Sequence, residues 1–163
     1  MTCMGRLHHV KQSLPLLVAQ PDLRCILVDY DCPDETGAWI EENLPHVLVV
    51  RATGTRHFNI SQARNMGARA ARTPWICFLD ADTLVPPDFG RAVLQSLQAG
   101  CYLIADPCPN DLAGLVVCQR SDFDAIGGFD ELFCGWGTED RDFHTRLRRH
   151  GHMVTSSAPD TMP

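Results

Sequence analysis

Long apolar runs and an excess of basic residues are both missing from this sequence. No apolar stretch approaches the roughly 20 residues that a helix needs to cross a bilayer, so we expect neither a transmembrane helix nor a secretory signal. Lys and Arg number 14 against 20 Asp and Glu, which gives a formal net charge of −6. Because affinity for phosphate backbones comes mainly from clustered Lys and Arg, this balance argues against a nucleic-acid binder. We expect a cytoplasmic protein.

Paired metal-binding cysteines are missing as well. The eight cysteines form no Cys-x-x-Cys pair, which argues against a zinc ribbon or a thioredoxin-type motif. Several lie in apolar segments, as Cys25 and Cys77 do, where a reduced thiol packs as a small hydrophobe. With 163 residues and a hydrophobic fraction of 45 %, the chain suits one globular domain over residues 1–163 and is too apolar to be disordered.

Short apolar runs alternate with segments of helical periodicity. The runs at residues 24–29, 46–52 and 74–80 predict buried strands, with weaker strand signals at 101–105 and 115–119. Helices are predicted at residues 6–20, 36–43 and 88–98, after a cap at Ser61, and from a cap at Thr138 to about residue 150. This alternation predicts an α/β fold with a mostly parallel sheet flanked by helices. Ligands of such sheets lie beyond the carboxyl ends of the strands, where two of the runs end in Asp29 and Asp80.

The triplet Asp80-Ala81-Asp82 is a candidate metal site. In extended backbone, residues two apart point the same way and lie ~7 Å apart, so both carboxylates can address one divalent cation. Mg²⁺ and Mn²⁺ take oxygen ligands and leave positions for phosphate oxygens when the protein supplies few. The alternative is a solvated turn in which Asp82 or Thr83 caps the next element. The apolar strand that delivers both acids to the ligand-binding edge favours the metal site.

A second cluster combines glycine, tryptophan and acids in residues 127–131 and 135–142. Glycines on both sides of Trp136 permit a tight turn that exposes the indole, a flat apolar face suited to a sugar ring. Glu139, Asp140 and Asp142 fall in the first turn of the last predicted helix, where favourable interaction with the helix dipole is the alternative role. As one unit the cluster predicts a binding and catalytic loop.

The last predicted helix is rich in arginine. Arg148, Arg149 and their neighbours could meet an anionic acceptor or an acidic membrane surface, so contact with the inner face of the membrane remains open. Asp142 and Arg146 are spaced four residues apart, as in the ion pairs of a solvated helix face. This second interpretation is favoured.

These motifs carry a resemblance to a known family. Residues 63–67 (ARNMG) followed by 75–82 (WICFLDAD) resemble the core of family 2 glycosyltransferases with the GT-A fold. Residues 127–131 (GGFDE) and 135–140 (GWGTED) resemble the acceptor-side motif shared by β1,4-galactosyltransferases and chondroitin-type polymerases. Residues 2–6 (TCMGR) resemble the loop after the first strand of that fold. The similarity spans almost the whole chain, with the motifs in matching order.

The resemblance implies a GT-A-like, Rossmann-type sheet. Residues 1–106 would form the nucleotide-sugar-binding half, and residues 107–163 an acceptor-side half that is expected to be truncated. Because Thr2 already lies in the loop that follows the first strand of the family, we expect that strand to be missing. A missing strand would expose backbone groups and apolar faces of its neighbours, so we expect a tendency to oligomerise.

The resemblance also implies a reaction. The chain would be a metal-dependent, inverting transferase that uses Mn²⁺ or Mg²⁺ and moves a sugar from a UDP-sugar to a carbohydrate or glycolipid acceptor. Asp29 would accept a hydrogen bond from the uracil ring, and Thr2 and Arg64 would lie near the nucleotide. Asp82 would hold the metal, with Asp80 near the ribose and the same ion.

On the acceptor side, the resemblance implies that Trp136, Gly137 and Glu139 contact the sugars and that Asp140 is the general base. Two effects on Asp140 oppose each other: a helix N-terminus favours its ionised form, whereas desolvation beside Trp136 would raise its pKa toward the range useful for a base. The sequence leaves both open.

Two alternative functions remain. One is a nucleotide-sugar-binding domain without turnover. The other is a nucleotidyltransferase, which would also place acids at strand ends for Mg²⁺. It is less favoured because a glycine-rich, basic phosphate loop is missing and because it leaves the Trp136 cluster unexplained.

Overall fold

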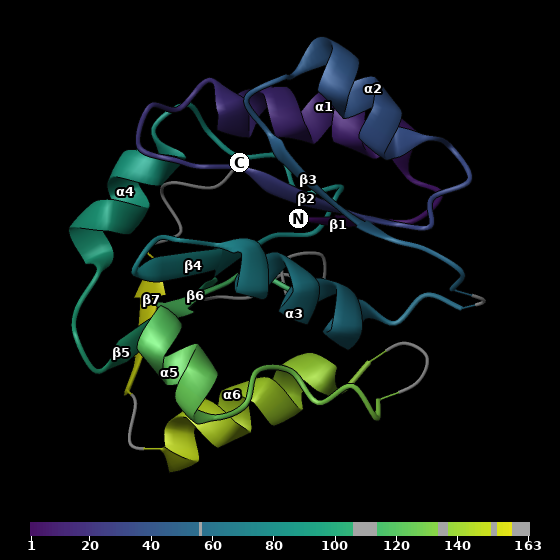
Figure 1. Cartoon of the computed structure of the whole chain (residues 1–163). Helices are drawn as coiled ribbons and strands as arrows, with labels where there is room; N and C mark the ends of the chain where they lie inside the picture. Colours follow the sequence, from purple (N-terminus) through teal and green to yellow (C-terminus); the bar gives the residue numbers. More distant parts are fainter. Residues whose placement is uncertain (56, 106–113, 134–136, 151–152, 158–163) are drawn as a thin grey trace.

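Strands and helices alternate along the chain as the sequence predicts (Figure 1). The computed structural model describes residues 1–55, 57–105, 114–133, 137–150 and 153–157. The strands are β1 (Thr2–Cys3), β2 (Ile26–Tyr30), β3 (Leu48–Ala52), β4 (Trp75–Phe78), β5 (Cys101–Ala105), β6 (Val116–Gln119) and β7 (Met153–Ser157). The helices are α1 (Leu7–Val18), α2 (Thr36–Asn43), α3 (Ile60–Ala70), α4 (Phe89–Ser96), α5 (Arg120–Ala125) and α6 (Glu139–Arg149).

The strands form two sheets. One has the order β1-β2-β3 and is wholly parallel. The other has the order β4-β6-β5-β7, in which β6 runs antiparallel to both of its neighbours while β5 and β7 are parallel. Figure 1 shows α1 and α2 on one side of the first sheet and α3 on the other. The fold is therefore α/β with helices on both faces, as expected.

The first strand, which the sequence led us to expect missing, is present in short form. Thr2 and Cys3 pair in parallel with Val28 and Asp29, and the N–H of Val28 donates to the carbonyl of Met1. Residues 2–3 are therefore strand and not loop. A two-residue strand carries too little periodicity to be recognised from sequence. Since β1 covers this edge of β2, the reason given for oligomerisation no longer holds there.

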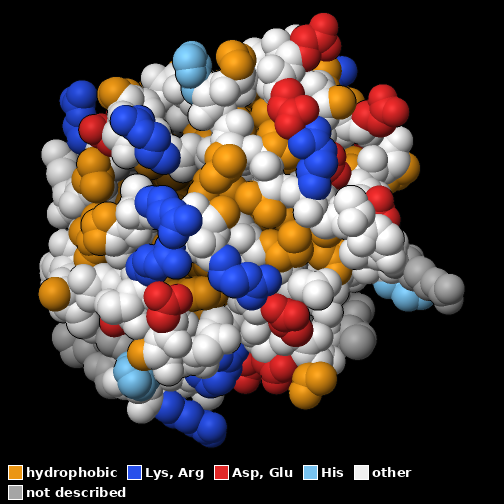
Figure 2. Space-filling view, viewed as in Figure 1, with side chains coloured by type: hydrophobic (Ala, Val, Ile, Leu, Met, Phe, Trp, Pro, Cys, Tyr) orange, Lys and Arg blue, Asp and Glu red, His pale blue; other side chains and the backbone are white. Residues whose placement is uncertain are grey.

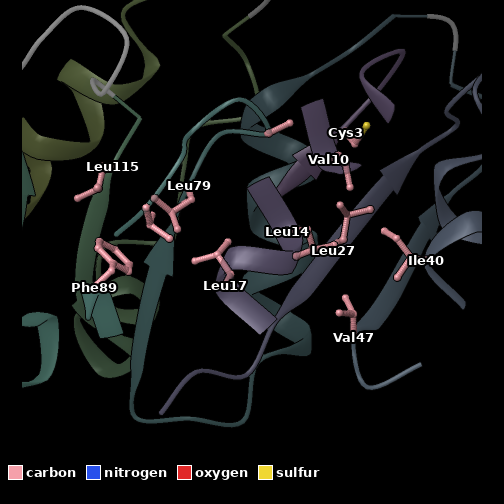
Figure 3. Close-up of a cluster of buried hydrophobic side chains, with 12 residues drawn as sticks. Cys3, Val10, Leu14, Leu17, Leu27, Ile40, Val47, Leu79, Phe89 and Leu115 are labelled. Carbon is pink, nitrogen blue, oxygen red and sulfur yellow. The ribbon is translucent and has the colours of Figure 1, made fainter. Parts of the chain in front are cut away.

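One apolar core joins the two sheets. Leu27 of β2 packs with Val10, Leu14 and Leu17 of α1, and the same cluster includes Leu79, Phe89 and Leu115 from the four-stranded side (Figure 3). Within β2 the next residue, Val28, faces the other way and packs with Ala63 of α3. This alternation follows the two-residue period of a strand and explains why β2 reads as a continuous apolar run.

Aromatic rings attach the segment around Phe129 and helix α6 to β4. Phe129 and Phe143 stack with centroids 4.1 Å apart, and Phe78 of β4 meets Phe129 edge-on at 5.1 Å. Phe143 is fully buried, so α6 is fixed by its apolar face. Because Phe143 lies one turn from the start of α6, this packing also positions the acids of its first turn.

The start of α3 differs from the prediction. Asn59, not Ser61, is the N-cap, and its side chain accepts a hydrogen bond from the N–H of Gln62 at 2.9 Å. Ser61 lies within the helix and is fully buried. Asn is as good an N-cap as Ser, so spacing alone could not choose between the two. Helix α5, only six residues long, was not predicted.

The molecular surface carries charges of both signs. On the face drawn in Figure 2, Lys and Arg side chains gather near the middle, with acidic and apolar side chains between and around them. No helix in the part of the chain that the structure describes is long and apolar enough to span a membrane.

Candidate active site

Helix α3 places one arginine in the interior of the molecule. Small residues let this helix approach the first sheet closely: a side-chain carbon added at Gly67 would lie 3.1 Å from Val28 Cγ2. Arg64 lies on the buried face of α3 and is only 3 % exposed. A buried guanidinium is stable only when it is paired and hydrogen-bonded, so its partners decide what it does.

The partners of Arg64 come from both acidic motifs. Its Nη1 donates to Asp140 Oδ1 at 2.6 Å and lies 3.6 Å from Glu139 Oε1. Its Nη2 donates to Asp80 Oδ1 at 3.1 Å. Acids 76 and 16 residues away along the chain are thus held on one side chain. The two segments that the sequence nominates separately lie together.

Burial decides the balance of effects on Asp140. It raises the pKa of Asp140 to about 6, opposed by the adjacent Arg64 and reinforced by the negative charges of Glu139 and Asp80. Burial and the two neighbouring acids therefore outweigh Arg64, and the net shift of the Asp140 pKa is upward. A carboxylate with this pKa is largely ionised at neutral pH and has the basicity that a general base needs.

Asp82 lies in a more open position than Asp80. Its Oδ2 receives a hydrogen bond from Arg6 Nη1 at 2.8 Å, and the two side chains are 40 % and 47 % exposed. Arg6 belongs to the loop between β1 and α1. The loop that follows β1 therefore contacts the Asp80-Ala81-Asp82 triplet across the edge of the two sheets.

Asp80 and Asp82 are the two carboxylates of the triplet that could hold a hard divalent cation. Each carboxylate uses one oxygen on an arginine, Oδ1 of Asp80 and Oδ2 of Asp82. Among the described residues there is no group of three or more His, Cys, Asp or Glu side chains placed to hold a metal. Two carboxylates suit Mg²⁺ or Mn²⁺, which retain positions for water and phosphate oxygens.

The backbone at Gly114 covers the Arg64–Asp80 pair, a contact that no sequence motif indicated. A side-chain carbon added there would lie 2.3 Å from Asp80 Oδ2 and 2.7 Å from Arg64 Nη2. Only glycine leaves room for this approach. The segment before β6 thus closes one side of the acid cluster.

Asp29 and Thr2 lie at the carboxyl edge of the first sheet. Asp29 is 7 % exposed, and its two oxygens accept backbone N–H groups of Cys32 at 2.9 Å and Gly37 at 2.8 Å. Thr2 in β1 is in register with Val28, the residue before Asp29, and is also buried. The carboxylate of Asp29 therefore shapes the turn into α2, and its role toward a nucleotide base remains a proposal.

The residues expected to contact sugars are only partly described. Trp136 lies outside the described residues. Gly137 has a φ of +96° and Thr138 a φ of +79°, so the chain enters α6 through a left-handed turn that Gly137 makes easy. Glu139 is 5 % exposed and faces Arg64, so it belongs to the interior of the cluster.

Asn65, the neighbour of Arg64, was overlooked at the sequence level. Its side chain donates to the carbonyl of Phe129 at 2.8 Å and accepts the N–H of Phe129 at 2.9 Å. It also donates to Glu131 Oε1 at 2.9 Å. The one feature of the sequence that could have pointed to Asn65 is its position beside Arg64 in residues 63–67. Asn65 fixes residues 127–131 to α3.

A cavity of about 640 Å³ lies next to this attachment. Its lining includes Asn65, Arg69, Gly127, Glu131 and Arg146 and does not include the acids bound to Arg64. Within α6, Arg146 Nε donates to Asp142 Oδ2 at 2.7 Å, so the predicted pair forms. Residues 127–131 therefore contribute one wall of a polar hollow beside the acid cluster.

Comparisons with known proteins identify relatives of the chain. A family model described as "Glycosyl transferase family 2" matches residues 1–150. Beta-1,4-galactosyltransferase 6 of Homo sapiens is 31 % identical, over 69 % of this chain and 32 % of that one. Validoxylamine A glucosyltransferase of Streptomyces hygroscopicus subsp. jinggangensis (strain 5008) is 27 % identical, over 61 % of this chain and 37 % of that one. The chain thus spans about a third of the length of these curated relatives.

Solved structures share the fold at low sequence identity. TarS 1-349 of S. aureus superposes with a TM-score of 0.81 at 12 % identity, over 99 % of this chain and 57 % of that one. The mannosyltransferase PcManGT of Pyrobaculum calidifontis was solved with GDP-Man and Mn²⁺. It superposes with a TM-score of 0.77 at 18 % identity, over 95 % of this chain and 52 % of that one.

Proposed function

The chain belongs to glycosyl transferase family 2, and from this membership we propose that it transfers a sugar from a nucleotide-sugar donor to a carbohydrate acceptor. The expected GT-A-type α/β fold is confirmed by the solved structures that share it. The relatives named above carry the names of sugar transferases. The proposal extends to a UDP-sugar donor, a divalent cation and inversion at the anomeric carbon.

One observation carries the proposal: Arg64 holds Asp80 and Asp140 on the same guanidinium. A transferase of this kind needs a donor side, where the diphosphate leaves, and an acceptor side, where a hydroxyl is activated. Asp80 belongs to the triplet suited to a metal–diphosphate complex, and Asp140 carries a raised pKa suited to a base. Their shared partner holds the two carboxylates close together, which supports the proposal.

On the donor side, Asp29 near the carboxyl end of β2 and Thr2 of the neighbouring β1 would contact the base, because ligands of such sheets bind at this edge. Asp80 and Asp82 would hold Mn²⁺ or Mg²⁺. When bound, such a cation acts as a Lewis acid and stabilises negative charge on the departing diphosphate. Arg6, already paired with Asp82, adds a positive charge beside the same group.

On the acceptor side, Asp140 accepts the proton of the attacking hydroxyl. Its Oδ1 is held by Arg64 at 2.6 Å, which fixes the orientation of the carboxylate and directs Oδ2 to the proton. Attack on the anomeric carbon from the face opposite the diphosphate inverts its configuration. Glu139, buried against the same guanidinium, keeps the region negative and helps hold the pKa of Asp140 high.

The test combines transfer and binding. Purified protein is incubated with several UDP-sugars and GDP-mannose, Mn²⁺ or Mg²⁺, and a panel of saccharide acceptors, while UDP affinity is measured by calorimetry. Asp140→Asn should abolish turnover and retain UDP binding, whereas Asp82→Ala should weaken metal-dependent UDP binding. Asp142→Asn, two residues along α6, is the matched control and should keep turnover.

The outcomes separate the alternatives. Unchanged turnover in Asp140→Asn would reject Asp140 as the base. Metal-dependent UDP binding without transfer to any acceptor would favour a nucleotide-sugar-binding domain. Family membership does not favour nucleotidyl transfer, the third possibility.

A further inference from the structure

Two cysteine side chains lie together at the carboxyl ends of β1 and β2, beside Asp29. Cys3 ends β1 and is paired in register with Asp29, and Cys32 follows β2. Their Sγ atoms are 3.9 Å apart. Figure 3 shows Cys3 close to Val10 at one end of the apolar core. A disulfide bond is about 2.05 Å long, so the sulfur atoms need to approach by roughly 2 Å to bond.

The two thiols have different surroundings. Cys32 is half-buried, and its Sγ accepts the N–H of Gly5 at 3.1 Å and lies 3.0 Å from Thr36 Oγ1. Burial raises the pKa of Cys32, but hydrogen bonds from Thr36 and from backbone N–H groups outweigh this, and the net pKa is lowered. Cys3 is 1 % exposed, and burial raises its pKa to about 11.

The geometry points to a redox-sensitive modification site, in which a hydroperoxide oxidises Cys32 and Cys3 then forms a disulfide with it. In the first step the Cys32 thiolate attacks the peroxide oxygen and the O–O bond breaks, which forms a sulfenic acid; the departing alkoxide or hydroxide takes up the proton that the thiol released and leaves as alcohol or water. Sulfur loses two electrons and the peroxide gains them. In the second step Cys3 sulfur attacks Cys32 sulfur, the S–O bond breaks, and hydroxide leaves as water with the Cys3 proton.

Thr36 is placed to assist the second step. Its Oγ1 lies 3.5 Å from Cys3 Sγ and 3.0 Å from Cys32 Sγ, between the proton to be lost and the hydroxide to be protonated. Cys3 needs such help because its buried thiol does not ionise at neutral pH. The two cysteines thus have different roles. Cys32 is partly exposed and reacts with the peroxide, whereas Cys3 is buried and forms the disulfide with oxidised Cys32.

Oxidation would reach the proposed nucleotide site, an expectation that rests on the function proposed above. The N–H of Cys32 donates to Asp29 Oδ1, and Cys32 Sγ receives the N–H of Gly5. Gly5 precedes Arg6, which pairs with Asp82. A disulfide to Cys3 turns Cys32 Sγ away from Gly5 and shifts both loops, so we expect oxidation to weaken UDP binding.

The first experiment measures thiol chemistry without reference to sugar transfer. Trypsin releases Cys25 and Cys32 in a single peptide, because no Lys or Arg lies between Arg24 and Arg51. The two cysteines are therefore measured one at a time, in the variants Cys25→Ser and Cys32→Ser. At pH 7, Cys32 in Cys25→Ser should be alkylated on the order of tenfold faster than Cys25 in Cys32→Ser. Thr36→Val should slow the alkylation of Cys32, because it removes a hydrogen bond that lowers the pKa of this thiol. Thermal melts of each variant check that it is folded.

The second measurement maps tryptic peptides of the Cys25→Ser chain after treatment with hydrogen peroxide and blocking of free thiols, so that Cys32 is the only cysteine in its peptide. The expected product joins the Cys3 and Cys32 peptides and is released by dithiothreitol. Equal alkylation rates of Cys25 and Cys32, or oxidation of Cys32 with no cross-link to Cys3, would overturn the proposal.

A final comparison separates this site from the proposed function. UDP affinity should fall at least about tenfold in the cross-linked protein and return on reduction, while Cys3→Ser should keep its UDP affinity under peroxide. A cross-link that leaves UDP affinity unchanged would overturn the link to the nucleotide site. If the reduced chain binds no UDP at all, the proposed function fails, whereas the cross-link still supports the thiol pair.

Discussion

Replacing Arg64 by methionine should destabilise the protein strongly and in a pH-dependent way. The guanidinium is 3 % exposed and contacts Asp80, Asp140 and Glu139 within 3.6 Å. Methionine keeps much of the side-chain volume against the ring of Phe129 but leaves three acids without their shared cation. Removing one partner of a buried ion pair costs about 3–5 kcal/mol. For a chain of this size this corresponds to a fall in Tm of roughly 6–20 °C.

The pH dependence identifies the cause. Asp140 has its folded pKa raised to about 6, so its attraction to Arg64 is present above that pH and is lost as the carboxyl protonates below it. The stability difference between wild type and Arg64→Met should therefore be large at pH 8 and smaller at pH 5. Melting curves followed by circular dichroism at both pH values measure it.

Arg69→Met is the matched control, because it makes the same change in the same helix. Arg69 is 62 % exposed and lies 3.8 Å from Glu131, so its loss should cost no more than about 1 kcal/mol. A loss of stability in Arg64→Met that is the same at pH 5 and pH 8 would show that packing and not charge is responsible. No loss at all would refute the central place of Arg64.

Three further predictions concern the same region. kcat/KM for transfer should fall about tenfold per pH unit below pH 6, where the Asp140 base becomes protonated, and a profile flat to pH 4.5 would contradict this. Gly114→Ala should disturb the Arg64–Asp80 pair, because the new carbon would lie 2.3 Å from Asp80 Oδ2; weaker metal-dependent UDP binding in calorimetry would show it. Phe143→Ala removes a fully buried ring and should cost about 3–5 kcal/mol in urea unfolding, with a loss below 1 kcal/mol refuting its place in the core.

Local pattern sufficed for much of the fold. The second predicted helix matches α2 (Thr36–Asn43), and the continuous apolar runs matched β2, β3 and β4 within two residues. The run at β2 is readable because this strand is buried along most of its length, so nearly every position is apolar. β3 is more exposed, but four of its five residues are still apolar. The short elements β1 and α5 were not predicted, because they have too few residues to show the hydrophobic periodicity of a strand or a helix.

The sequence indicated which residues belong to the candidate site, but it did not predict the contacts between them. Motif spacing nominated Asp80 and Asp140, yet the ion pairs that join them through Arg64 span 16 and 76 residues and depend on how α3 and α6 pack. The pKa of Asp140 depended on burial, which the sequence does not encode locally. Asn65 and Gly114 were missed because their importance arises only where another segment approaches them.

The division of the strands into two hydrogen-bonded sets has a mechanical consequence. Asp29 belongs to one set and Asp80 follows the other, and within the described residues no backbone ladder joins the two. Side-chain packing, unlike a ladder, permits small sliding displacements without breaking directional bonds. The two sheets can therefore shift against each other by small amounts, so that the separation of Asp29 and Asp80 can change while each sheet keeps its own shape.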